Sequence, residues 1–401
     1  MTETKSHSDP IVITGAARTP MGGFQGDLSD VPAPQLGGIA IKAALDRAGV
    51  APTDVDDVIM GLCLFAGLRQ APARQAAHHA GIPWEAGCTT ISKMCGSAMK
   101  AAMQAHDGIL AGSSTVTVAG GMENMSNAPY LLERARQGYR LGHGGAVKDH
   151  MFLDGLEDAY DQGKLMGCFA EDTARKYQFT RDAQDEFAIE SLNRAKKAIE
   201  DGTFKDEIEP VVVKTRKGEA VIEQDEQPLK ADIEKIRKLK PAFAADGTVT
   251  PANSSSISDG GAALVLMRMS EAKKRAVTPL AVIHGHATHA QEPAWFTTAP
   301  IGAVEKLLDK TGWHKADVDL FEINEAFAVV TMAAMRDLDL PHDKVNVHGG
   351  ACALGHPVGA SGARIIVTLL AALQKYDLTK GIATLCIGGG EATAMAFERL
   401  N

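Results

Sequence analysis

Apolar and polar residues follow one another in blocks that predict strands and helices in turn. Residues 11–15 (IVITG) and 57–62 (DVIMGL) are apolar runs of strand length, and residues 34–48 (PQLGGIAIKAALDRA) between them have the pattern of an amphipathic helix. Strand, helix and strand in this order are typical of proteins with buried parallel strands. The pattern therefore predicts an α/β fold.

The same module returns late in the chain. Residues 49–60 (GVAPTDVDDVIM) correspond to residues 312–323 (GWHKADVDLFEI), and residues 116–126 (VTVAGGMENMS) correspond to residues 384–394 (TLCIGGGEATA), at offsets of about 263 and 268 residues. A period this long indicates a duplicated α/β half rather than a solenoid repeat. Chance similarity between two α/β segments is the alternative.

The segment between the two halves has a different character. Residues from about 128 to 256 are richer in charge, and Thr180 begins a capped helix that runs to about Asp201. We therefore predict an N-terminal half over residues 1–127, completed by about 257–279. A loop domain over 128–256 is inserted in it, and a C-terminal half follows over 280–401.

Composition and charge exclude several classes of function. The chain has 401 residues, of which 45% are hydrophobic and 23% charged, enough for a large buried core. A net charge of −9 gives no support to nucleic-acid or membrane-surface binding. The longest apolar helix, after Ser361, is too short to span a bilayer, so we expect it to be buried. The polar start, MTETKSHSDP, favours a cytoplasmic protein without a signal peptide.

The spacing of the cysteines does not fit a metal site, a redox motif or a disulfide framework. The six are scattered and contain no CxxC pair, which argues against zinc ribbons, thioredoxin-like redox chemistry and a disulfide framework. Cys95 lies where a short strand (Thr89, Thr90, Ile91) gives way to a helix. The positive end of a helix favours an anion, so the thiol there is expected to tend toward thiolate. The alternative is a small buried apolar residue.

Three further stretches carry candidate chemistry, each with a plain structural alternative. INEAFA (323–328) ends an apolar strand in a polar pair, which is also typical of a helix cap. HGGACALGHPVGASG (348–362) places His356 in a glycine loop, where a histidine is either idle or held near a reacting group. ATLCIGGGEAT (383–393) places Cys386 before three glycines, whose backbone N–H groups can form an anion hole.

Together these stretches carry a resemblance. SKMCGSAMKA, VAGGMENMS, INEAFA, GGACALGHPVGASGAR and CIGGGEATA, in this order, are similar to the thiolase family, and most similar to its biosynthetic acetyl-CoA acetyltransferases. The resemblance covers nearly the whole chain. It implies a duplicated five-layer α-β-α-β-α fold with a loop domain for coenzyme A, and a homotetramer. The implied reaction is a reversible Claisen condensation of two acetyl-CoA molecules to acetoacetyl-CoA and coenzyme A.

The resemblance also implies a role for each site residue. Cys95 becomes acetylated, His356 is its base, and Cys386 is the second acid and base. Asn324 holds a water that, with His356, binds the enolate oxygen, while the N–H groups of Gly388 and Cys95 form the other oxyanion hole. Ser255 contacts pantetheine. Met166 and Phe327 lie near the thioester, with Leu165 beside them. No metal or cofactor is expected, and the histidines of HGHATH (284–289) are interpreted as structural.

The chain departs from the family pattern at a few positions. Leu165 replaces a common histidine, Leu229 takes the place of a basic residue near the adenine end of coenzyme A, with Lys230 beside it, and His348 replaces a common asparagine. A 3-ketoacyl-CoA thiolase of broader range is therefore the nearest alternative function. An inactive thiolase-like lipid-binding module is a remote one.

Overall fold

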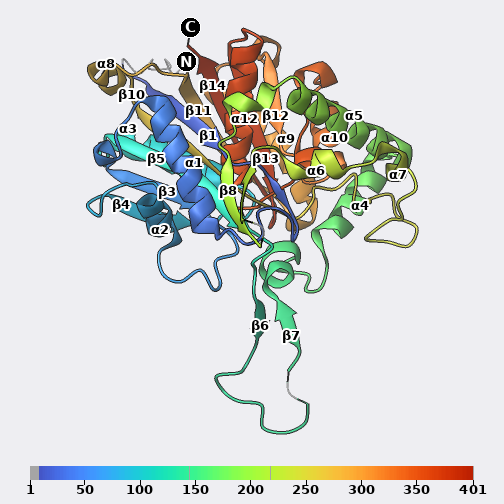
Figure 1. Ribbon diagram of the computed structural model, residues 1–401. Coiled ribbons are helices and arrows are strands. Elements are labelled where there is room, and N and C mark those ends of the chain that lie inside the picture. Colours follow the sequence, from blue (N-terminus) through green and yellow to red (C-terminus); the bar gives the residue numbers. More distant parts are fainter. Residues whose placement is uncertain (1–8, 144, 217, 401) are drawn as a thin grey trace.

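The computed structural model describes residues 9–143, 145–216 and 218–400 (Figure 1). The first eight residues, which contribute to the prediction of no signal peptide, lie outside the described residues. Within the described part of the chain, no helix is long and apolar enough to cross a membrane.

A mixed sheet runs through the centre of the molecule. Its strands are arranged in the order β12-β13-β14-β11-β1-β10-β5-β3-β4, with β2 beside β10. The first half supplies β1 (Ile11–Arg18), β2 (Gly22–Gly23), β3 (Asp57–Gly61), β4 (Gly87–Ile91), β5 (Val116–Asn124) and β10 (Ser258–Arg268). The second supplies β11 (Ala281–Ala290), β12 (Leu320–Ile323), β13 (Lys380–Ile387) and β14 (Glu391–Arg399). Strands β1 and β11 share only two paired positions, so the sheet behaves as two sheets joined at this seam.

Helices cover both faces of each half-sheet. The outer layer of the first half is α1 (Ala33–Ala48) and α2 (Pro72–His79), the central layer is α3 (Ser97–Ala111) and α12 (Ser361–Lys375), and the outer layer of the second half contains α9 (Ala299–Thr311). Side chains alternate between the faces of a strand. In β10, Val265 packs in the core of α1 and α2 while Leu264 packs in that of α3 and α12. In β14, Ala394 packs with α9 and Met395 with α12. The predicted five-layer α-β-α-β-α fold is confirmed.

The two halves repeat each other in detail. Asp56 accepts two backbone N–H groups at the start of β5, and Asp319 accepts two at the start of β13. Gly49 ends α1 with a φ of 66°, and Gly312 ends α9 with a φ of 69°. Because only glycine takes such angles without strain, both helix ends are fixed in the same way. The Asp-Val-Asp repeat in the sequence thus marks a duplicated unit.

The segment between β5 and β10 contributes most of the remaining elements. A hairpin arm of β6 (Tyr130–Leu132) and β7 (Val147–Asp149) projects from the body (Figure 1). Helices α4 (Met166–Tyr177) and α5 (Arg181–Glu200) lie against α10 (Ala328–Asp337) of the second half. The others are β8 (Val211–Thr215), β9 (Gly218–Ile222), α6 (Glu226–Lys230) and α7 (Ile233–Ile236), with α8 (Met269–Arg275) and α11 (Ala351–Leu354) further on. This segment closes one side of the site described next.

Candidate active site

A cavity of about 380 Å³ opens where the two halves and the inserted segment meet. Most of its wall is apolar. Seven of the nine residues predicted for the site lie on this wall: Cys95, Leu165, Met166, Ser255, Phe327, His356 and Gly388. The other two, Asn324 and Cys386, are buried with no exposed surface.

Cys95 sits in a tight turn between β4 and α3. Met94 takes a φ of 45°, a region that non-glycine residues rarely occupy, and it turns the chain so that Cys95 reaches the cavity. A side chain at Gly96 would bring its Cβ within 2.3 Å of Ile387. Gly96 therefore permits the end of β13 to approach the cysteine closely.

The resting Cys95 sulfur is a neutral thiol, contrary to the thiolate expected from its place before a helix. Burial raises the pKa of Cys95 to about 11, and the nearby Glu123 acts in the same direction. The backbone N–H groups of Gly388 and of Cys95 itself face the sulfur and lower the pKa, but by less. Removal of the thiol from water outweighs the partial charge of the helix end. The same two N–H groups are placed to stabilise an oxyanion.

His356 is held as a neutral imidazole with one nitrogen free. Its Nδ1 lies 2.5 Å from Ser361 Oγ, and Ser361 Oγ donates to the Pro357 carbonyl at 2.9 Å. Because the hydroxyl proton is committed to Pro357, Nδ1 must carry the proton and donate it to Ser361. Nε2 is then a lone-pair acceptor, and it has no partner among the described residues. Burial, together with Arg364, lowers the pKa of His356 to about 3.

Asn324 is oriented by a buried cation. Arg364, with no exposed surface, donates to Glu322 at 2.9 Å and to Asn324 Oδ1 at 3.3 Å. Since arginine can only donate, the amide oxygen of Asn324 must face Arg364. Its Nδ2 group therefore points toward His356, whose Nδ1 is 3.5 Å away. Two donors at this distance do not hydrogen-bond to each other, which leaves the amide N–H available.

Cys386 lies behind the cavity wall, near Cys95. It packs with Phe327 in an apolar cluster under the cavity. Burial raises the pKa of the Cys386 thiol well above its usual value, and Cys95 adds to this rise. Cys386 is therefore also neutral at rest, and it can act as a proton donor before it acts as a base.

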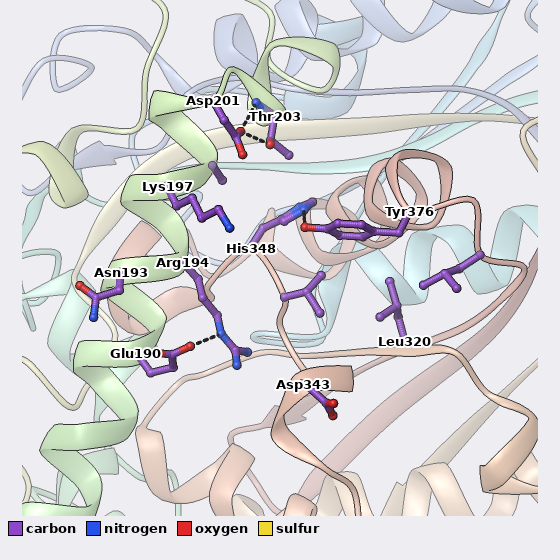
Figure 2. Close-up of a pocket in the computed structure, with 13 residues that line it drawn as sticks. Glu190, Asn193, Arg194, Lys197, Asp201, Thr203, Leu320, Asp343, His348 and Tyr376 are labelled. Atoms are coloured by element: carbon purple, nitrogen blue, oxygen red, sulfur yellow. Dashed lines mark hydrogen bonds and ion pairs between the residues drawn. The ribbon is translucent and has the colours of Figure 1, made fainter.

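A second cavity, of about 550 Å³, lies apart from these residues (Figure 2). Polar side chains of α5, among them Arg194 and Lys197, face His348 and Tyr376 across it. The His348 ring approaches the Tyr376 hydroxyl at 3.2 Å, and burial lowers the pKa of His348 to about 4. His348, one of the residues that depart from the family pattern, thus belongs to this second cavity rather than to that of Cys95.

One group of three potential metal ligands occurs in the described part of the chain. Asp107 lies 3.0 Å from His106 Nδ1 and 2.9 Å from His286 Nε2, so the carboxylate can accept a hydrogen bond from each ring. The positive charges of Lys100 and Lys310 also act on His286. Nearby positive charge and mutual hydrogen bonding agree with a structural role for His286, a member of HGHATH.

Two residues that serve the site lie in the quoted motifs but were not assigned roles there. Ser361 and Arg364 come from the stretch that follows His356, and they fix the tautomer of His356 and the orientation of Asn324. Arg364 had one available signal, because a charged residue inside an otherwise apolar helix needs a buried partner.

Comparisons with known proteins give matches over nearly the whole chain. Residues 11–270 match the thiolase N-terminal domain, and residues 277–399 match the thiolase C-terminal domain. The chain is 48% identical to an acetyl-CoA acetyltransferase of Cupriavidus necator over 97% of its own length and 99% of the relative's. It is also 48% identical to the cytosolic acetyl-CoA acetyltransferase of Mus musculus, over 98% and 99% of the two chains.

Two solved structures are also similar to this chain over nearly its whole length. The acetyl-CoA acetyltransferase of Bacillus anthracis superposes with a TM-score of 0.95 at 43% identity, covering 98% of this chain and 99% of the other. The Acat5 thiolase of Ascaris suum, in complex with coenzyme A, gives 0.92 at 39% identity, covering 98% and 100%.

Proposed function

This chain belongs to the thiolase family, and we propose from its site that it is an acetyl-CoA acetyltransferase that condenses two acetyl-CoA molecules to acetoacetyl-CoA and coenzyme A, reversibly. The observation that carries the proposal is the placement of Cys95, two N–H donors and the free nitrogen of His356 around one apolar cavity. Acyl transfer needs a nucleophile, a base and an oxyanion site, and all three are present.

The first half-reaction acetylates Cys95. Its sulfur attacks the thioester carbonyl of acetyl-CoA while His356 Nε2 takes the thiol proton. The N–H groups of Gly388 and Cys95 stabilise the oxyanion. The C–S bond to coenzyme A then breaks, and Cys386 gives its proton to the departing thiolate. Acetyl-Cys95, free coenzyme A and a Cys386 thiolate result.

The second half-reaction forms the carbon–carbon bond. The Cys386 thiolate takes a proton from the methyl group of a second acetyl-CoA, and a water held by Asn324 together with His356 stabilises the enolate oxygen. The carbanion attacks the acetyl carbonyl, Cys95 leaves, and His356 returns the proton to it. Apart from the coenzyme A thioesters themselves, the proposal includes no metal and no cofactor.

The acyl end of the substrate fits the apolar part of the cavity. Leu165, Met166 and Phe327 line it together with Phe152 and Phe243. We place the thioester against Met166 and Phe327, with pantetheine passing Ser255. Leu165 is the residue that keeps the broader-range 3-ketoacyl-CoA thiolase as the alternative, because a larger apolar surface there favours longer chains.

We also propose a homotetramer in the cytoplasm. The hairpin arm exposes large apolar side chains, including Leu141 with 96% of its surface exposed and Tyr130 with 69%, which is typical of a surface covered by another copy. Strand β4 is an uncovered edge of the sheet. The relative from mouse is named as a cytosolic form. Sedimentation analysis of the purified protein measures the oligomeric state.

Mass spectrometry after mixing with acetyl-CoA tests the function. One acetyl group on the peptide that contains Cys95 is expected, with none in a Cys95→Ser variant. An unmodified peptide would refute acyl transfer and favour an inactive lipid-binding module. Rates of thiolytic cleavage across a series of 3-ketoacyl-CoA chain lengths then separate acetoacetyl-CoA specificity from a broader range.

A further inference from the structure

Each half of the chain carries a glutamate in the same place of its Gly-Gly-x-Glu motif. Glu123 follows Gly120 and Gly121 in β5, and Glu391 follows Gly388 and Gly389 at the start of β14. Each side chain contacts the half of the molecule to which it does not belong.

Glu123 connects the loop of His356 to that of Cys95. Its Oε2 accepts the backbone N–H of Gly359 at 2.8 Å and that of Cys63 at 2.9 Å. Gly359 is three residues after His356, and the Cys63 thiol donates to the carbonyl of Met94, next to Cys95, at 3.1 Å. One carboxylate, with no exposed surface, thus links both reactive loops.

Glu391 makes the complementary connection. It forms an ion pair with Lys93, two residues before Cys95, and it comes three residues after Gly388, whose N–H faces the Cys95 sulfur. The two side chains keep 34% and 22% of their surface exposed. The pair therefore joins the strand end that supplies an oxyanion donor to the turn that supplies the nucleophile.

The charge of Glu123 is not there to activate the sulfur. A carboxylate near a thiol opposes its ionisation, and Glu123 acts on Cys95 in this sense. Burying a carboxylate is also costly unless several donors compensate it. Its contribution is therefore geometric, through the backbone groups that it holds in place, and the same reasoning extends to its counterpart.

We propose that Glu123 and Glu391 are positioning residues that act as crossed connections between the duplicated halves: Glu123 sets the distance from His356 to Cys95, and Glu391 sets that from the Gly388 N–H to Cys95. The expected effect of these residues on acetyl transfer rests on the proposed function. Their effect on the positions of Cys95, His356 and Gly388 does not, because any reaction of the Cys95 thiol with His356 depends on these positions.

A charge exchange at the half-exposed pair tests Glu391. Removing one oxyanion donor lowers rates by about 10²–10³, so partial misplacement in Lys93→Glu or Glu391→Lys should slow acetylation of Cys95 by at least about tenfold. The double variant should recover to within about threefold of wild type. Asp54→Asn breaks the Arg275–Asp54 pair, of similar exposure at 24% and 39%, and should leave the rate unchanged. Failure of the double variant to recover would overturn the assignment.

Glu123→Gln tests the buried connection. Acetylation should slow by about tenfold or more, with KM for acetyl-CoA little changed. Glu226→Gln is the control, because Glu226 is also buried and accepts two backbone N–H groups, those of Gly23 and Asp27. The Glu226→Gln variant should have a lower thermal stability but an unchanged rate of Cys95 acetylation. An acetylation rate in Glu123→Gln equal to that of the wild type would refute the proposal for Glu123.

Alkylation of Cys95 by iodoacetamide distinguishes failure of the positioning roles from failure of the proposed function, because it needs no acetyl-CoA. Glu123 raises the pKa of Cys95, so loss of its charge alone would speed alkylation. Slower alkylation in Glu123→Gln and Glu391→Lys, but not in the controls, therefore supports the positioning roles even if wild type takes up no acetyl group. In that case only the proposed function fails. Equal or faster alkylation in these two variants would overturn the positioning roles.

Discussion

Ser361→Ala should change the tautomer of His356, and with it the rate at which Cys95 is acetylated. In the native protein Ser361 Oγ is the acceptor for the Nδ1 proton of His356. Without the hydroxyl, the remaining polar contact of Nδ1 is with Asn324 Nδ2 at 3.5 Å, which is a donor. The variant therefore favours a proton on Nε2, and this tautomer cannot accept the proton of Cys95.

The size of the effect follows from the cost of a buried donor without an acceptor. That cost is about 1–3 kcal/mol, and about 1.4 kcal/mol corresponds to a factor of ten in an equilibrium. If the whole cost falls on the tautomer with its proton on Nδ1, which is the one able to accept the proton of Cys95, the rate of acetylation falls roughly 5- to 150-fold. The affinity for acetyl-CoA should hardly change, since Ser361 is buried and is not on the cavity wall.

Rapid-quench mass spectrometry of a single turnover measures this rate. Thr368→Val is the matched control, because Thr368 lies on the same helix, is also fully buried, and donates to Glu207 away from the site. It should lose stability and keep the acetylation rate. A stable Ser361→Ala variant that acetylates Cys95 as fast as wild type would refute the assigned tautomer.

Four further outcomes are expected. Cys386→Ser should still acetylate Cys95, more slowly because a hydroxyl is a weaker proton donor to the departing thiolate. It should lose steady-state turnover at least about 100-fold, measured by coenzyme A release, because proton removal from the second acetyl-CoA is blocked. Alkylation of Cys95 should rise about tenfold per pH unit up to pH 10, without a plateau near 9, since its pKa is about 11. Arg18→Met should lower the free energy of unfolding by about 3–5 kcal/mol in urea titrations, because it leaves two buried carboxylates without their cation. His348 has a folded pKa of about 4 against 6.5, so the unfolded chain binds its proton first as the pH falls. His348 should then contribute a loss of stability of about 3 kcal/mol between pH 6.5 and 4. His356 loses stability in the same pH range, so the total drop in His348→Asn should be smaller than in wild type by about this contribution.

The layered fold was predictable because its signals are local. Alternating apolar runs define strands whatever surrounds them, and a glycine such as Gly49 or Gly312 ends a helix through its own backbone angles. The duplication was also visible, because the segments that carry Asp56 and Asp319 repeat in the sequence itself, although the two carboxylates accept N–H groups 59 and 60 residues away. The strand, helix-end and repeat signals can therefore be read from the sequence without knowing these long-range partners.

The electrostatic state of the site was not predictable in this way. The position of Cys95 before α3 suggested a thiolate, but the pKa is decided by burial that the whole fold creates. The role of Ser361 depends on where a single hydroxyl proton goes, and that of Glu123 on backbone groups 60 and 236 residues away along the chain. A sequence pattern identifies such residues as polar and buried without giving their partners.

The cavity in which we place the thioester also determines how the proposed chemistry starts. Its apolar walls exclude water, which raises the pKa of Cys95 and lowers that of His356, so both are neutral at rest. A pre-formed thiolate and imidazolium pair is therefore not the reacting state. In the proposed mechanism the proton therefore moves to His356 as the sulfur attacks, and negative charge first appears on the carbonyl oxygen. We expect the N–H groups of Gly388 and Cys95 to carry most of the stabilisation, which requires the duplicated halves that supply them to be held in register.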